Sequence, residues 1–233
     1  MPRTRGRAPT GGRAGALSRE IIVGAAVELL DERGERGLTF RLLATRLKTG
    51  PGALYWHVAN KDELVALAAD HVLGGAFATV PSTTDEGPVA GLRALAVAVF
   101  DALDRHPWAA VHVNAPATLP HALHLLDRIG TLVAGTGLPA GQQFAVATAI
   151  SYYITGVSAQ IVAPHASVRA DTGREDYLAR TAERWAELDP EDYPFLTRTT
   201  ADLRDHDDRD QFTTGLGLLL AGLRTGADPR PPA

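Results

Sequence analysis

Three adjacent ring side chains, Tyr55, Trp56 and His57, form the most chemically distinctive cluster in this sequence. They fall in residues 53–58, which are expected to form a short helix. Consecutive residues of a helix point in different directions, so the three rings cannot all be buried. Their polar groups can donate hydrogen bonds to phosphate oxygens, and their faces can press on sugars and thymine methyl groups. The cluster therefore indicates nucleic-acid contact; a helix hairpin with one or two buried aromatics is the alternative.

The residues before the rings have the pattern of a helix, a tight turn and a second helix. Thr39 is a suitable N-cap for the first helix, on which Leu43 and Leu47 share an apolar face. A break at Gly50 follows, and Pro51 then falls at the first position of a helix, where its missing N–H costs least. Two short helices joined by a turn are the unit that places a helix in the DNA major groove.

The run from Leu54 to Lys61 (LYWHVANK) resembles the end of the DNA-reading segment of tetracycline-repressor-type (TetR) regulators. The run from Leu38 to Ala44 is similar to the preceding helix of the same family, at the right distance. The resemblance is specific over residues 16–67 and architectural beyond them. It implies an all-α fold, with an N-terminal three-helix helix-turn-helix module followed by a helical body that binds a ligand and dimerises.

The resemblance also implies roles for individual residues in DNA binding. Arg41 would read a base, guanine by preference, through its guanidinium fork, and Trp56 would lie close to both the backbone and the bases. The DNA-binding residues implied in this way are Thr39, Phe40, Arg41, Lys48, Pro51, Ala53, Tyr55, Trp56, His57 and Lys61. The family usually has Gly-Val where this chain has Lys48-Thr49. Lys48 is therefore expected to adopt a turn conformation that glycine adopts more easily, unless the turn differs slightly from that of the family.

Charge is divided unevenly along the chain. Residues 1–61 contain 11 Lys and Arg against 5 Asp and Glu, a net charge of +6, whereas residues 62–233 contain 12 against 22, a net charge of −10. A basic N-terminal unit on an acidic body is the electrostatic pattern of a DNA-binding protein. The sequence has no cysteine, which excludes a disulfide framework and a thiolate metal site. Neither a signal peptide nor a membrane helix is expected, which favours the cytoplasm.

Three segments are expected along the chain. Residues 1–16 form a disordered basic arm, which either follows phosphates and enters a minor groove or only raises non-specific affinity. Residues 17–61 form the helix-turn-helix DNA-binding domain, whose first helix, Leu17 to Arg33, is closed by Gly34 in a left-handed cap. Residues 62–233 form the ligand-binding and dimerisation domain.

The body reads as a series of helices, beginning with one that Asn60 caps and that continues to Phe77. No Asp, Glu, Lys or Arg occurs between Ile129 and Val168. Within this stretch, residues 139–163 are expected to form one long helix that Pro164 ends. The remaining expected elements are helices over residues 88–105, 107–113, 121–135, 175–187 and 209–224 and a charged, solvated linker over residues 202–210.

The charge-free helix carries too many polar residues to cross a membrane, so its composition indicates burial by protein on most sides. We expect this helix and the helix over residues 209–224 to pair with their copies in a second subunit, as a four-helix bundle. The resulting homodimer would read a palindromic DNA sequence. The alternative is that both helices lie in the core of a monomer.

The resemblance further implies that the body encloses a small effector. The candidate ligand-binding residues are polar or aromatic groups on otherwise apolar helices: Phe77, Phe100, Trp108, His112, Asn114, Phe144, Thr148, Tyr152 and Gln160. His112 resembles the family position that holds a magnesium-binding histidine, but Ala115 and Pro116 replace polar neighbours there. Phe77 likewise replaces a ligand-contacting histidine. A hydrophobic or aromatic effector is therefore expected rather than tetracycline, with no cofactor or metal. Whether His112 contacts ligand or is a core histidine stays open.

These observations predict a ligand-responsive transcriptional repressor, which binds a palindromic operator in double-stranded DNA as a homodimer and is released by its effector. An activator or a regulator without an effector is one alternative. An enzyme that uses the histidines of the body is another, although the sequence has no HExxH, GxSxG or phosphate-loop motif.

Overall fold

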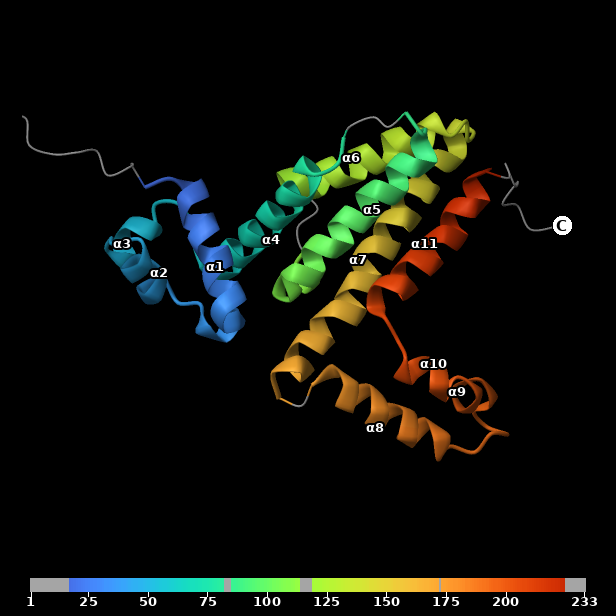
Figure 1. Cartoon of the computed structure of the whole chain (residues 1–233). Helices are drawn as coiled ribbons and strands as arrows, with labels where there is room; N and C mark the ends of the chain where they lie inside the picture. The colour runs from blue at the N-terminus through green and yellow to red at the C-terminus, as the bar shows by residue number, and fades with distance from the viewer. Residues whose placement is uncertain (1–16, 82–84, 114–118, 172, 225–233) are drawn as a thin grey trace, which may run out of the picture.

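The computed structural model describes residues 17–81, 85–113, 119–171 and 173–224, and the elements within these ranges are all helical. The all-α prediction is thus confirmed. In chain order the helices are α1 (Arg19–Gly37), α2 (Phe40–Arg46), α3 (Pro51–Leu54), α4 (Lys61–Ala78), α5 (Pro88–Arg105), the 3-10 helix η1 (Pro107–Val111), α6 (Pro120–Gly135), α7 (Ala140–Asp171), α8 (Arg174–Ala186), α9 (Pro194–Arg198), α10 (Thr200–Arg204) and α11 (Asp208–Arg224). Figure 1 shows α1–α3 at one end of the molecule, with α4 leading from them into the body.

The N-terminal helices begin where side chains close their first turns. Ser18 caps α1 by accepting from the backbone N–H of Ile21 at 3.3 Å, and Thr39 caps α2 by accepting from that of Leu42 at 3.2 Å. Regular helix in α1 ends before Gly34, which has φ 63° and ψ −178°. Positive φ at Gly34 agrees with the predicted end of the helix, although one further turn follows it to Gly37.

Core side chains join these short helices to the start of α4. Ile22 and Leu29 of α1, Leu43 of α2, Leu54 of α3 and Leu64 of α4 are all at most 1% exposed and belong to one apolar cluster. Short helices are not stable alone, because each forms too few hydrogen bonds to offset the conformational entropy that is lost when its backbone becomes ordered. Their shared core is what holds α3 against α2.

The helix predicted over residues 53–58 is shorter and starts earlier. Pro51 occupies its first position, as expected, but regular helix ends at Leu54. A turn follows, closed by a 3.1 Å hydrogen bond from the backbone N–H of Val58 to the carbonyl of Leu54. Gly52 and three consecutive ring residues have low helix propensity, so one helical turn and one looser turn form instead of a longer helix.

Lys48 has φ 53° and is the one non-glycine residue with positive φ among the residues described. This confirms the strained turn expected there. Left-handed backbone costs a side-chain-bearing residue about 1–2 kcal/mol, and glycine loses about 0.5–1 kcal/mol in additional chain entropy. Lys48→Gly is therefore expected to raise the free energy of unfolding by about 0.5–1 kcal/mol in chemical denaturation. Lys48→Ala is the matched control, because it removes the same charge and keeps the strain; equal stabilities of the two variants would contradict the explanation.

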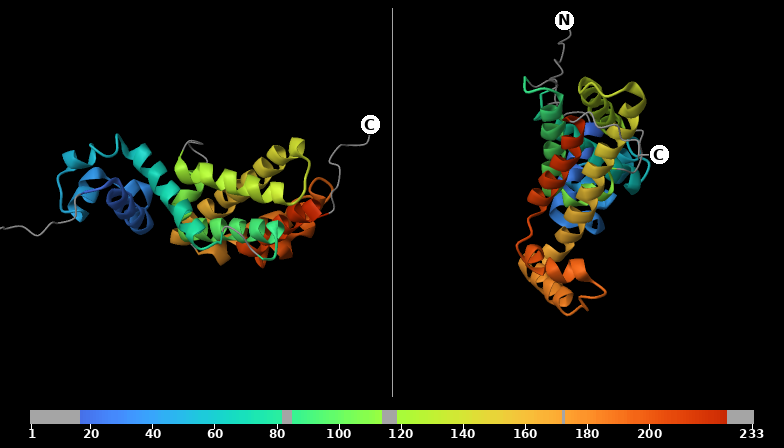
Figure 2. Two further views of the ribbon diagram at one scale, coloured as in Figure 1. Left: turned by 90° about the horizontal axis from the view of Figure 1, so that it is seen from above. Right: turned by 90° about the vertical axis from the view of Figure 1, so that its right-hand side faces the viewer.

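The body packs α5, α6, α7 and α11 side by side, and α8, α9 and α10 form a lobe beyond α7 (Figures 1 and 2). Aromatic stacking anchors α11 to the rest. The Phe212 ring stacks on that of Phe100 with centroids 4.4 Å apart and on that of Tyr153 at 5.5 Å. The Tyr153 hydroxyl donates to the Phe212 carbonyl at 2.9 Å. Gly215 makes room for this contact, because a Cβ there would lie 2.2 Å from the hydroxyl oxygen.

Two predictions about the body are wrong. Helix α7 continues past Pro164 to Asp171. Proline inside a helix costs about 3 kcal/mol, because it removes a backbone donor and its ring crowds the preceding turn. The upstream turns of α7 are packed in the core at Ile150 and Ile154, and such tertiary contacts override local preference. The predicted linker over residues 202–210 contains the end of α10 and the start of α11. None of the described helices has the length and apolar character needed to cross a membrane.

Candidate DNA-reading surface and effector pocket

The ring cluster points away from the N-terminal core. Trp56 is 87% exposed and Tyr55 is 58% exposed, whereas Leu54 and Val58 on either side are buried. Exposed indole and phenol groups on a short turn contribute nothing to that core, and exposing them to water is unfavourable. Their position therefore favours an external contact over the hairpin with buried aromatics.

Residues of α2 extend the same exposed surface. The Phe40 ring meets the Tyr55 ring edge-on, with centroids 4.6 Å apart, and so supports it from α2. Arg41, Thr39 and Lys48 are exposed, Pro51 is exposed at the start of α3, and Ala53 and His57 are partly buried. Aromatic, basic and hydroxyl groups therefore come together around the turn between α2 and α3.

Hydrogen bonds fix the chain just after the rings. Arg19 of α1 donates to the carbonyl of His57 at 3.0 Å and pairs with Glu63 of α4 at 3.1 Å. Asn60 caps α4 by accepting from the backbone N–H of Glu63 at 2.8 Å, as predicted. Lys61, expected to contact phosphate, donates through Nζ to the carbonyl of Glu35 at the end of α1. The reading segment is thus tied to α1 at two points.

Two of the predicted ligand-binding residues line a cavity of about 390 Å³ between α6 and α7. They are Thr148 and Tyr152. The cavity is lined by Val113, Ala122, Leu123, Leu125, Leu126, Thr148, Ser151, Tyr152 and Thr155, none of which is charged. The Thr148 and Thr155 hydroxyls donate to the carbonyls of Phe144 and Ser151, at 2.9 and 3.0 Å. Their oxygens are therefore left to accept hydrogen bonds.

The other predicted ligand residues that the structure describes lie outside the lining of this cavity. Phe100 is 1% exposed in the stacked core with Phe212. Phe77 packs beside the rings of His121 and His124. Phe144 and Gln160 are exposed on α7. Asn114 lies outside the described residues.

His112 and Trp108 contact carboxylates of α1 instead. The Trp108 indole N–H donates to Asp31 at 2.7 Å, and Nδ1 of His106 lies 2.8 Å from the same oxygen. Nε2 of His112 lies 2.6 Å from a carboxylate oxygen of Glu35. Sequence reasoning missed both carboxylates, because acidic residues on a surface helix match the pattern of ordinary solvated positions.

A third carboxylate joins α4 to α6. Asp70 is 6% exposed and accepts from the backbone N–H groups of His121 and Ala122, both at 3.0 Å, and from Nδ1 of His121 at 2.8 Å. These N–H groups are unpaired donors of the first turn of α6, which Asp70 therefore caps from another helix. Gly74 allows the close approach, since a Cβ there would lie 2.6 Å from the His121 ring.

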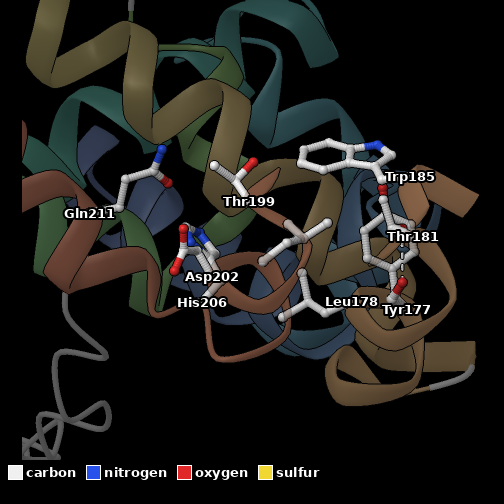
Figure 3. A pocket seen from close by; sticks show the side chains of 9 residues that line it. Tyr177, Leu178, Thr181, Trp185, Thr199, Asp202, His206 and Gln211 are labelled. Atoms are coloured by element: carbon white, nitrogen blue, oxygen red, sulfur yellow. Dashed lines mark hydrogen bonds between the residues drawn. The ribbon is translucent and has the colours of Figure 1, made fainter. Parts of the chain in front are cut away.

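Another hollow, of about 350 Å³, lies in the lobe formed by α8, α9 and α10 (Figure 3). Tyr177 and Trp185 of α8 face it, and Asp202 and His206 lie across from them. None of the predicted ligand residues is among its lining. Across the described residues, no three His, Asp or Glu side chains are grouped closely enough to hold a metal ion.

The structure combines a helix-turn-helix module with a helical body, which is an arrangement found in one class of DNA-binding regulators. Comparison with known proteins assigns the chain to that class. Residues 22–68 match the family described as bacterial regulatory proteins, tetR family, and residues 81–226 match the tetracyclin repressor-like C-terminal domain. The chain belongs to the TetR family of transcriptional regulators.

Similar proteins cover nearly the whole chain. A helix-turn-helix transcriptional regulator of Saccharopolyspora erythraea is 35% identical over 217 residues, which are 91% of this chain and 86% of that protein. The class D tetracycline repressor of Escherichia coli is 31% identical over 89% of each chain. The solved structure of the transcriptional regulator SCO7222 of Streptomyces coelicolor is 40% identical, with a TM-score of 0.74 over 90% of this chain and 98% of that one.

Proposed function

We propose that this protein is a homodimeric repressor that covers a palindromic operator and is released by a small, uncharged effector bound between α6 and α7. The observation that carries the proposal is the outward-facing surface around the turn between α2 and α3. Trp56 and Tyr55 are exposed there beside Arg41, while their neighbours Leu54 and Val58 hold α3 in the core. No catalytic role is assigned to any residue.

Each part of this surface matches a component of DNA recognition. Arg41 offers a bidentate donor for guanine, which is worth about 1–3 kcal/mol of discrimination. The polar groups of Tyr55 and His57 can donate to phosphate oxygens, which position the protein without selecting sequence. The net charge of +6 over residues 1–61 draws this part of the chain toward DNA and makes the affinity fall with salt. We infer the boundary between the two domains at residues 61 and 62, where α4 begins.

Apolar side chains that the single chain leaves exposed support the proposed dimer. Phe144 and Tyr152 on α7 are 75% and 71% exposed, and Leu218 on the neighbouring α11 is 75% exposed. Exposed apolar groups on two adjacent helices are typical of surfaces that another protein covers. A second copy offers the same two helices, and four together form a bundle. Such a dimer places two reading surfaces on half-sites about 34–36 Å apart or at a similar spacing.

The lining of the cavity defines the effector chemistry. Its walls are aliphatic apart from Tyr152 and three hydroxyl side chains, so a charged ligand would lose hydration without gaining a partner. The hydroxyl oxygens of Thr148 and Thr155 accept hydrogen bonds, since their protons are already donated to carbonyls. The effector expected is therefore an apolar or aromatic molecule that carries hydroxyl or amide donors.

Operator binding by the purified full-length protein tests the proposal. A duplex selected from random DNA by the protein, or taken from the promoter of its own gene, is titrated while its fluorescence anisotropy is followed. Arg41→Ala is expected to weaken binding about 5- to 150-fold for each half-site, the loss of about 1–3 kcal/mol associated with one base contact, and the homodimer loses this contact in both half-sites. The double variant His57→Ala with Tyr55→Phe is expected to weaken binding to all sequences alike, because it removes hydrogen-bond donors to phosphate and no base contact.

Arg180→Ala is the matched control for charge, because Arg180 is exposed on α8, far along the chain from the reading surface. It is expected to bind the operator within about twofold of the wild type, as a distant surface charge does at moderate salt. If Arg41→Ala and the double variant also bound as the wild type does, the assignment of this surface to DNA would be wrong.

A further inference from the structure

The 3-10 helix η1 lies at the junction between the N-terminal module and the body. The Trp108 side chain packs against the apolar cores of both units. Its indole N–H and the His106 ring contact Asp31 of α1. These residues are more than 70 positions apart in the chain, so η1 is where the body contacts α1 through polar groups.

Glu35 is bonded on two sides at this junction. Its carboxylate accepts from Nε2 of His112 at 2.6 Å, and its backbone carbonyl accepts from Nζ of Lys61. Lys61 is the first residue of α4, directly after the reading segment. A link of two hydrogen bonds therefore runs from His112 of the body through Glu35 to the base of the DNA-reading segment.

The body end of this link adjoins the effector pocket. Val113, the next residue after His112, is 8% exposed and lines the cavity between α6 and α7. The backbone N–H groups of His112 and Val113 both donate to the carbonyl of Ala109, at 2.9 and 3.1 Å. The two residues are held on one turn, so a displacement of Val113 also displaces His112.

We propose that Glu35 is the positioning residue that couples the effector pocket to the DNA-reading segment, with His112 as its contact to the body and Lys61 as its contact to the segment. This inference rests on the proposed function, since it assumes the effector site between α6 and α7. An occupant that pushes Val113 outward pulls His112 from Glu35 and frees α1 and Lys61 from their DNA-binding arrangement. The coupling is a difference in stability of this contact between the free and the occupied body.

The link works by position and not by charge. Nε2 of His112 needs an acceptor at the place of the Glu35 carboxylate oxygen. Glutamine presents a carbonyl oxygen there, whereas alanine presents nothing. Glu35→Gln should therefore retain the coupling, and Glu35→Ala should lose it while the Glu35 backbone carbonyl still receives Lys61.

A tethered occupant replaces the unidentified effector in the experiment. The chain has no cysteine, so Ser151→Cys introduces a single thiol on the cavity wall. N-phenylmaleimide adds to that thiol, with the sulfur bonding one alkene carbon and the proton going to the other, and leaves an aromatic group in the cavity. Operator affinity of the full-length protein is measured before and after labelling, in the background of Glu35, Glu35→Ala or Glu35→Gln. Labelling of Ala201→Cys, an exposed site on α10, controls for the reagent.

Labelling of Ser151→Cys is expected to weaken operator binding at least 10-fold, within the usual range of allosteric coupling. With Glu35→Ala the same label is expected to change binding less than twofold, and Glu35→Gln is expected to restore the response. A merely structural role for Glu35 would lower thermal stability without altering the response to the label. Far-UV circular dichroism and a melting curve of each variant establish that it is folded.

Two other results would overturn the proposal in distinguishable ways. If labelling weakened operator binding equally with Glu35 and with Glu35→Ala, the proposed link through Glu35 would be wrong and the proposed function would stand. The coupling would then belong to another contact between the pocket-lining α6 and α4, in which Asp70 of α4 accepts from the first turn of α6. If labelling of Ser151→Cys left operator binding unchanged, the proposed effector site would be wrong. The link through Glu35 would then be wrong as well, because it assumes that site.

Discussion

Phe212→Ala is expected to lower the free energy of unfolding by about 3–5 kcal/mol, the usual cost of removing a buried phenyl ring. Phe212 is fully buried, and its ring stacks on those of Phe100 and Tyr153. The substitution leaves a cavity between α5, α7 and α11 that the rigid rings around it fill poorly. Guanidinium denaturation at one fixed protein concentration measures the loss, because the stability of a dimer depends on concentration.

Phe195→Ala is the matched control for this prediction. Phe195 lies on α9 and is 63% exposed, so the same change of side chain removes little burial. The free energy of unfolding of this variant is expected to fall by less than about 1 kcal/mol. Similar losses for Phe212→Ala and Phe195→Ala would contradict the view that the stacked rings hold α11 to the body.

Leu218→Glu is expected to convert the protein to a monomer and to weaken operator binding 100-fold or more. Leu218 is 75% exposed on α11, so the protomer tolerates a charge there. In the proposed four-helix bundle the same position is covered, and two unpaired carboxylates would be buried close to the two-fold axis. Burying an unpaired charge costs several kcal/mol, and about 2.7 kcal/mol already corresponds to a factor of 100.

Light scattering after size exclusion measures the mass, and anisotropy measures the operator affinity. The wild type is expected at twice the 24.7 kDa mass of the chain and Leu218→Glu at that mass. Phe195→Glu is the control, because it places the same charge on an exposed apolar residue outside α7 and α11. A dimeric Leu218→Glu variant with full operator affinity would rule out this interface.

The local features of the DNA-reading module could be predicted from the sequence because neighbouring residues determine them. Ser18, Thr39 and Asn60 cap their helices through N–H groups three positions further along the chain. The positive φ of Lys48 follows from a turn that must close within a few residues. Such contacts span one turn, so a residue type in the right place is enough to indicate them.

The boundaries inside the body could be predicted less well. Pro164 marks the end of a helix by local rules, yet α7 continues past it. The upstream turns of α7 pack against α5, α6 and η1. The energy of this packing comes from contacts with other helices, which a rule based on the residues around the proline does not include. A local signal is overridden in this way wherever tertiary contacts contribute more than the local cost.

By itself the sequence determined the all-α fold, because periodicity and helix caps are local properties. Its resemblance to the TetR family indicated the class of the protein and the surface proposed to face DNA, because the motif that carries the resemblance is also local. Only the tertiary structure decided which side chains of the body contact one another and which contact the N-terminal module. His112 was open between a ligand contact and a core histidine, and it lies against Glu35, 77 positions away. Asp31, Glu35 and Asp70 have the sequence pattern of ordinary charged helix positions. Their roles arise only when folding brings η1 to α1 and α6 to α4, because a hydrogen bond between distant residues leaves no periodic pattern in the chain.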